Sequence, residues 1–195
     1  ALRGNLHLFL YTKPAGAPAF TGLGFFEIAR VPGLVFMENR RSGFRDYCAA
    51  LPRRPEGVKG AVVMNANPFT LGHRHLVEHA AAACDSLYLF VLSEEAGPIP
   101  AGVRKELVLR GISHISGVLV QDTGPYMISS ATFPSYFFRD SEEVIRAQAQ
   151  LDLAVFARIA RELDIRIRFV GEEPNSLVTG LYNQIMAARL PEAGI

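Results

Sequence analysis

Short apolar runs alternate with amphipathic segments along the chain from residue 60 onward. The apolar runs have the length of buried strands, and the amphipathic segments repeat their apolar residues at the spacing of one helical face. This alternation predicts an α/β fold with a doubly wound parallel sheet and right-handed crossovers. The expected strands are Ala61–Met64, Leu87–Leu92, Val118–Gln121 and Arg166–Val170, and the expected helices are Leu71–Ala83, Val103–Ile112, a long helix introduced by an Asp140–Glu143 capping box, and Val178–Leu190.

The first 56 residues carry a different pattern, which suits the C-terminal half of a larger domain. Three strands, a helix over Phe44–Leu51 and a hairpin turn at Val31–Gly33 are expected there, and Thr12–Pro18 is expected to be a loop. The strands are Leu6–Tyr11, Phe25–Arg30 and Leu34–Glu38. Prolines, charges and glycine at Pro52–Gly57 predict a linker, which divides the chain into units 1–56 and 57–195. Because the chain begins at Ala1 without an initiator methionine, we expect a fragment.

The stretch Gly60–His73 carries the strongest indication of function. It predicts a buried strand that ends abruptly in Asn-Ala-Asn-Pro and is followed at once by a helix. This geometry directs backbone N–H groups and the positive end of a helix dipole at a bound phosphate. Gly72 would let the backbone approach a ligand, and His73 would donate a hydrogen bond to phosphate oxygens. The alternative is an ordinary strand–helix junction with a solvated histidine, as in α/β proteins that bind no phosphate there.

Ligands of open α/β sheets bind at the carboxyl ends of the strands, where four segments converge here. Those segments are 65–73, 93–104, 121–132 and 171–175. In this crevice a cationic imidazole at His73 would stabilise the charge that grows on an attacked phosphoryl group. Arg104 would bind departing pyrophosphate, or it is a solvated helix residue. The segments also contain the turn residues Ser129, Ser130 and Thr132, whose hydroxyl groups could donate to a ligand. Glu172 or Glu173 could accept a hydrogen bond from a ribose. Each of these residues is equally compatible with an ordinary role in a turn or on the surface.

Composition narrows the function classes. The chain has 195 residues, 49% of them hydrophobic, and a net charge of +1, so no nucleic-acid or membrane partner is indicated. The two cysteines, Cys48 and Cys84, lie outside any metal-ligand spacing, and a cytoplasmic setting is expected. His75 and His79 lie one helical turn apart but lack the further ligands that zinc needs, so no protein-bound metal is expected. The sequence contains no P-loop, G-x-G-x-x-G or G-x-S-x-G motif.

Several stretches resemble known families. Thr70-Leu71-Gly72-His73 resembles the T/H-x-G-H signature of the nucleotidyltransferase superfamily, which has a Rossmann-like fold. The stretches VVMNANPFTLGHRHLVEHAA (62–81), MISSATFPSYFFRD (127–140) and VGEEPNSLVTGLYNQIM (170–186) resemble the citrate lyase ligase family. LFLYTKPA (8–15) and GLGFFEIARVPGLVFMENR (22–40) resemble that family's N-terminal part, the C-terminal half of a GNAT-like acetyltransferase fold.

The resemblance implies an ATP-dependent ligase. Such enzymes acetylate, through an acetyl-adenylate, the thiol of the dephospho-coenzyme-A-derived group on the acyl-carrier (gamma) subunit of citrate lyase, and release AMP and pyrophosphate. The implied cofactor is ATP with Mg²⁺ carried on the nucleotide, and the implied partners are acetate and the carrier subunit. The residues carried over are His73, Thr70 and Arg104 for catalysis, Asn65, Ala66, Asn67, Phe69, Gly72, Gly171 and Glu172 for the nucleotide, and Ser129, Ser130 and Thr132 for substrate or carrier.

Two departures from the resemblance and two rival functions remain at this point. The first half of the acetyltransferase-like domain is missing, and so is the superfamily's downstream Ile-Ser-x-x-x-x-Arg signature, which Ile128-Ser129-Ser130 echoes without the arginine. One rival is another T-x-G-H enzyme, such as a pantetheine-phosphate adenylyltransferase. The other is a carrier-binding module without catalysis. An acyl acid that drives turnover would separate the first rival from the ligase.

Overall fold

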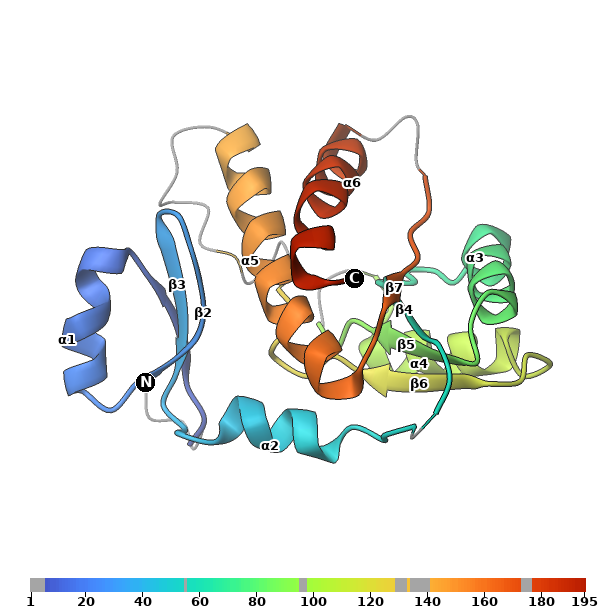
Figure 1. The fold of residues 1–195 in the computed structure, drawn as a ribbon, viewed down its shortest axis with the longest axis horizontal. Helices are drawn as coiled ribbons and strands as arrows, with labels where there is room; N and C mark the ends of the chain where they lie inside the picture. The colour runs from blue at the N-terminus through green and yellow to red at the C-terminus, as the bar shows by residue number, and fades with distance from the viewer. Residues whose placement is uncertain (1–5, 55, 95–97, 129–132, 134–140, 173–176) are drawn as a thin grey trace.

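The computed structural model contains two sheets (Figure 1). It describes residues 6–54, 56–94, 98–128, 133, 141–172 and 177–195. The larger sheet has four strands in the order β6-β5-β4-β7, and every neighbouring pair is parallel. Its strands are β4 (Lys59–Met64), β5 (Ser86–Val91), β6 (Val118–Asp122) and β7 (Ile167–Arg168). The parallel sheet predicted from the apolar runs is therefore confirmed, although β7 is much shorter than expected.

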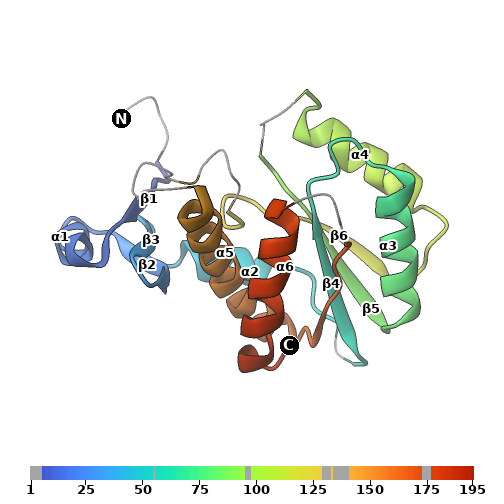
Figure 2. The same cartoon turned by 90° about the horizontal axis from the view of Figure 1, so that it is seen from above.

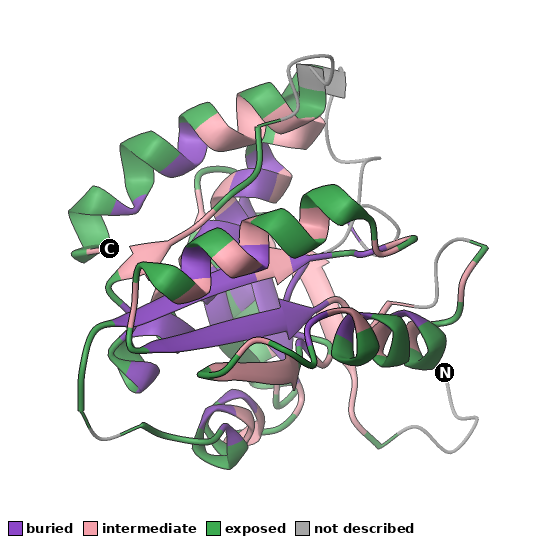
Figure 3. Ribbon diagram, turned by 90° about the vertical axis from the view of Figure 1, so that its right-hand side faces the viewer, coloured by how far each residue is buried: buried purple, intermediate pink, exposed green. Residues whose placement is uncertain are grey.

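Helices cover both faces of this sheet (Figure 2). One face packs through Val62, Leu87 and Leu89 against Val77 and Val108, which belong to α3 (Leu71–Ala82) and α4 (Ala101–Gly111). The other face packs through Ala61, Tyr88 and Phe90 against α5 (Ser141–Leu163) and α6 (Leu177–Arg189), with a short 3₁₀ turn, η3 (Pro191–Ala193), after α6. The central strands are buried on both sides, as a parallel sheet requires (Figure 3).

The N-terminal residues form a small antiparallel sheet with the order β1-β3-β2. Its strands are β1 (Phe9–Thr12), β2 (Phe26–Val31) and β3 (Leu34–Glu38). The loop expected over Thr12–Pro18 is wrong, because this stretch contains a 3₁₀ turn, η1 (Pro14–Gly16), and the start of α1 (Ala17–Gly22). Prolines in the first turns supply the reason: proline has no N–H to lose at a helix start and its fixed φ already suits the helix.

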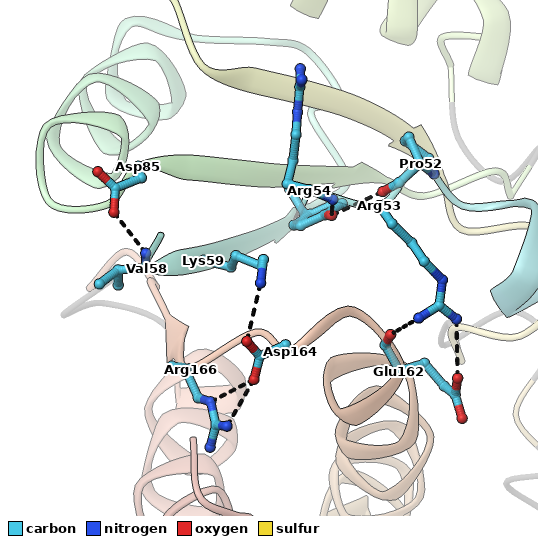
Figure 4. A network of polar contacts seen from close by, with 10 residues as sticks. Pro52, Arg53, Arg54, Val58, Lys59, Asp85, Glu162, Asp164 and Arg166 are labelled. Carbon is cyan, nitrogen blue, oxygen red and sulfur yellow. Dashed lines mark hydrogen bonds and ion pairs between the residues drawn. The ribbon is translucent and has the colours of Figure 1, made fainter. Parts of the chain in front are cut away.

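The predicted linker is anchored to the amino end of the parallel sheet (Figure 4). After α2 (Gly43–Ala50), the Arg53 guanidinium donates to the carbonyl oxygen of Glu162 at 2.7 Å, at the end of α5. The Tyr88 hydroxyl donates to the carbonyl of Pro52 at 2.9 Å. Lys59 pairs with Asp164 at 3.1 Å. These contacts lie opposite the strand ends where a ligand is expected.

Both sheets share one hydrophobic core. Helix α5 lies between them (Figure 1), and Ile28, Leu34 and Phe36 of the small sheet cluster with Phe156 and Ile159 of α5. Glu38, at the end of β3, is 3% exposed and accepts hydrogen bonds from the Tyr126 hydroxyl at 2.9 Å and the Phe44 N–H at 2.7 Å. The division at residue 56 stays a prediction. None of the helices in the described part of the chain has the length and apolar character needed to cross a membrane.

Candidate functional site

The turn after β4 has a backbone that is typical of ligand-binding sites. Asn65 is exposed, whereas Ala66 is 1% exposed and has a φ of 51°. A left-handed backbone costs a non-glycine residue about 1 kcal/mol, and such conformations gather at functional turns. Asn67, Phe69 and Thr70 all lie in the short loop between the end of β4 and the start of α3.

Thr70 and His73 close a capping box at the first turn of α3. The Thr70 side chain accepts a hydrogen bond from the His73 N–H, and His73 Nδ1 accepts from the Thr70 N–H at 3.1 Å. The Thr70 hydroxyl also lies 2.8 Å from Nδ1. This arrangement is the usual reciprocal cap with histidine in place of the common Glu or Gln. The box accounts for Thr70 and His73 of the motif and holds the His73 ring in place.

The capping box also fixes the tautomer of His73. A ring nitrogen that accepts a backbone N–H carries no proton, so the proton of the neutral ring belongs on Nε2. The cationic imidazole expected from the sequence does not fit this contact, because an imidazolium would have N–H groups on both nitrogens. His73 thus presents an oriented neutral N–H donor at a helix N-terminus. The Phe69 ring stacks on it with centroids 5.8 Å apart.

Gly72 has open space around it. A methyl group added there would meet only Thr70 Oγ1, at an ordinary contact distance of 3.7 Å, and Gly72 lies in regular helix. Neither packing nor backbone conformation therefore requires glycine at this position. The first backbone N–H groups of a helix have no hydrogen-bond acceptor within the helix. The open space at Gly72 therefore lies beside backbone donors of the kind that bind phosphate.

Arg104 is fully buried, at 0% exposure, and the alternative of a solvated helix residue is wrong. Its guanidinium donates to the Asn65 carbonyl at 2.7 Å, to Asn65 Oδ1 at 2.5 Å and to the Ile99 carbonyl at 3.2 Å. It also donates to the Glu94 carbonyl. The side chain therefore ties the turn after β4 to the loop between β5 and α4. Its positive charge is met by the carbonyl oxygens of these three residues.

Two buried acceptors at the strand ends have no hydrogen-bond partner among the described residues. They are Asn67 Oδ1 and Glu94 Oε1. Buried acceptors normally have donors, so each of these atoms calls for a ligand group or water. The neighbouring strand ends are joined firmly, because the Ser93 N–H donates to Thr123 Oγ1 at 3.0 Å and the Gly124 N–H donates to Ser93 Oγ at 3.1 Å. Sequence reasoning missed Glu94 and this link, since short polar residues in loops give no distinctive pattern.

The remaining predicted residues divide into placed and undescribed ones. A methyl group on Gly111 would lie 2.3 Å from Phe69, so Phe69 packs tightly on the end of α4. Gly171 adjoins α3, since a methyl group there would meet Leu76 at 4.0 Å. Glu172 is exposed. The residues Glu173, Ser129, Ser130 and Thr132, and the expected cap Asp140, lie outside the described residues. Among the residues that the structure describes, no group of three or more His, Cys, Asp or Glu side chains could hold a metal ion.

Comparison with known families decides where the chain belongs. The family model described as "Citrate lyase ligase C-terminal domain" matches residues 59–195. The chain belongs to the citrate lyase ligase family. This match covers the whole parallel sheet with its helices, an arrangement consistent with a nucleotidyltransferase-like domain.

Curated relatives carry the same family name. The chain is 45% identical over 195 residues to a [citrate [pro-3S]-lyase] ligase of Klebsiella pneumoniae, covering 98% of this chain and 57% of the relative. It is 41% identical over 188 residues to the protein of that name from Escherichia coli K12, covering 94% and 53%. The Haemophilus influenzae ligase is 40% identical over 191 residues, covering 96% and 57%. The chain thus spans little more than half the length of these relatives.

Proposed function

We propose that this chain carries the adenylating site of an ATP-dependent acetate:thiol ligase that activates citrate lyase. An acetate oxygen attacks the α-phosphorus of ATP, the bond to the β-phosphate oxygen breaks, and acetyl-adenylate and pyrophosphate form. The thiolate on the citrate lyase acyl-carrier subunit then attacks the acetyl carbon, giving the thioester and AMP. The thiol proton passes to solvent. The substrates and the partner are those that the family name implies.

The capping box of Thr70 and His73 is the single observation that carries the proposal. It fixes an N–H donor, His73 Nε2, beside the backbone donors at the start of α3. Donors held in place before reaction stabilise the negative charge that grows on the phosphoryl oxygens without any cost of reorganisation. The open space at Gly72 lets the phosphate approach that backbone closely.

The strand ends offer groups of the right type for the rest of ATP. The buried acceptors Asn67 Oδ1 and Glu94 Oε1 suit ribose hydroxyl or adenine amino donors, which phosphate lacks. Mg²⁺ would arrive with the triphosphate and keep most of its water ligands, which needs no dedicated protein cage. We assign Arg104 a positioning role: it holds Asn65, Glu94 and Ile99, and its buried charge favours the triphosphate. Gly171 and Glu172 remain candidate nucleotide contacts.

The small sheet is proposed to be the C-terminal half of a GNAT-like domain, as its sequence resemblance implies. Its shared core with α5 would fix such a domain rigidly against the adenylating site. Ser129, Ser130 and Thr132 stay candidates for substrate or carrier contacts. A cytoplasmic setting is proposed from the resemblance and the free thiols.

Exchange of labelled pyrophosphate into ATP tests the function. We expect exchange that requires acetate, because reversible formation of acetyl-adenylate returns labelled pyrophosphate to ATP. Exchange that instead requires a phosphate ester would identify the pantetheine-phosphate type of adenylyltransferase. Carrier binding with no exchange and no ATP binding would support the non-catalytic module and contradict the proposal.

A further inference from the structure

Helix α4 exposes apolar side chains and buries a charged one. A helix that packs on a sheet normally buries its apolar residues and turns its charged residues to solvent. α4 buries Val108 in this way, but it also buries Arg104 and exposes Val103, Leu107 and Leu109. Val103 and Leu107 are four residues apart, so they lie on the same side of the helix. One side of α4 is therefore an apolar surface that faces solvent.

This surface lies beside the start of α3. Both helices pack on the same face of the parallel sheet (Figure 2). At one end of α4, Gly111 packs against Phe69, which lies just before α3, and at the other end Arg104 holds Asn65. Leu71, the first residue of α3, is 74% exposed. Exposed apolar side chains of two helices thus border the place where the proposed adenylation occurs.

The charges at these helix starts favour an acidic partner. Acidic side chains are common in the first turn of a helix, because they stabilise the positive end of its dipole. The first turns of α3 and α4 contain none, whereas α5 begins with Glu142 and Glu143. The apolar surface is therefore bordered by two positive helix ends without a nearby carboxylate of their own. Such a surface complements a partner that presents apolar side chains together with acidic ones.

The proposed reaction brings one protein to this edge of the molecule. Its second step uses a thiol attached to the acyl-carrier subunit, and that thiol has to reach acetyl-adenylate at the start of α3. The body of the carrier must therefore approach the carboxyl edge of the parallel sheet.

We propose that the carrier docks on the exposed side of α4 together with Leu71. Val103 and Leu107 contact its apolar side chains, and the starts of α3 and α4 face its acidic groups. This inference rests on the proposed function, because the acetyl-transfer step is what brings a carrier to this edge.

The double variant Val103→Gln/Leu107→Gln tests the docking surface. Glutamine is polar and is a good helix former, so α4 should fold normally. We expect the KM for the carrier subunit in acetyl transfer to rise about tenfold or more, because replacing central apolar contacts of an interface weakens binding to that extent. Pyrophosphate exchange needs no carrier, so its KM values for ATP and acetate should stay within about twofold of the wild type.

Two single variants serve as controls. Val58 precedes β4 at the amino edge of the sheet and is 46% exposed, close to the 45% of Val103, so Val58→Gln should leave every KM unchanged. Leu23→Gln probes the exposed surface of the small sheet's unit. An unchanged carrier KM in the double variant, or a larger rise with Leu23→Gln than with the double variant, overturns the proposal.

A binding measurement separates this inference from the proposed function. Fluorescence anisotropy of the labelled carrier subunit, without nucleotide, measures docking without turnover. Weaker binding by the double variant supports the docking surface even if exchange fails, whereas wild-type binding by that variant overturns it even if exchange succeeds. In the same measurement Val103→Glu should weaken binding several-fold more than Val103→Lys, and an equal or reversed effect contradicts an acidic partner. Sedimentation velocity covers the other occupant: a wild-type dimer that the double variant dissociates would assign the surface to a second copy of the chain and overturn the proposal.

Discussion

Gly72→Ala should change stability and nucleotide binding in opposite directions. Gly72 lies in the first turn of α3 in ordinary helical conformation, and an added methyl group would meet only Thr70 Oγ1 at 3.7 Å. The folded chain therefore accepts alanine without strain. Alanine restricts the unfolded chain more than glycine does, which stabilises the fold by roughly 0.4–1 kcal/mol.

The same methyl group would stand where the phosphate has to approach the backbone. Forcing an additional methyl group into a close contact costs about 1–3 kcal/mol, which corresponds to a roughly 5- to 150-fold weaker Kd for ATP. Urea unfolding measures the first effect, and isothermal titration with ATP and Mg²⁺ measures the second. Activity alone would not separate them.

Gly22→Ala is the control for this experiment. Gly22 ends α1 in the small sheet's unit, far from α3, and a methyl group there meets nothing within 4 Å (Figure 1). This variant should bind ATP like the wild type. If Gly72→Ala binds ATP normally, the phosphate does not lie at this helix start. If Gly72→Ala is less stable than the wild type, the glycine serves the fold itself, and the reasoning is refuted.

Four further predictions concern other groups. His73→Ala should lower the rate of pyrophosphate exchange about 10²–10³-fold. His73→Gln should keep the capping box but not the exchange activity. His75→Ala, at an exposed neighbouring position, should change neither the capping box nor the exchange rate. Arg104→Lys should lower the urea-unfolding free energy by about 1–3 kcal/mol, since one ammonium group cannot serve every carbonyl that the guanidinium reaches. Burial raises the pKa of Asp152, so the folded chain holds this proton more tightly than the unfolded chain, and the unfolding free energy falls as the pH rises above about 4; Asp152→Asn should make that fall shallower. Burial raises the pKa of Cys48 to about 11, so iodoacetamide at about pH 8 should label it far more slowly than a model thiol, as mass spectrometry will show.

The parallel sheet could be predicted from the sequence because local signals agreed. The apolar run of β4, the abrupt turn at Asn65–Pro68 and the helical face of α3 each pointed to the same unit, and the boundaries of α3 came within one residue. The Thr70–His73 cap is a local feature of the same kind. Its geometry involves only four neighbouring residues, but it was not identified from the sequence, because histidine stands where a capping box usually has Glu or Gln.

Contacts between distant residues could not be predicted in this way. Nothing near Arg104 in the sequence indicates that it turns inward to Asn65, which lies 39 residues earlier, because an arginine in a first helical turn is usually solvated. The position of the Arg168 guanidinium, 4.3 Å from the centre of the Phe156 ring, likewise depends on how α5 packs against β7. The helix at residues 14–22 was missed for a different reason: its prolines were interpreted as loop residues although they also favour helix starts.

The most direct test follows an oxygen atom through the reaction. The chain is incubated with ATP, Mg²⁺ and acetate labelled with ¹⁸O in both oxygens, with hydroxylamine as the acceptor of the acetyl group. If acetate attacks the α-phosphorus at the start of α3, the AMP released contains one ¹⁸O atom and the pyrophosphate contains none. AMP formed without ¹⁸O would show that acetate never bonds to the α-phosphorus, and it would contradict the proposed reaction.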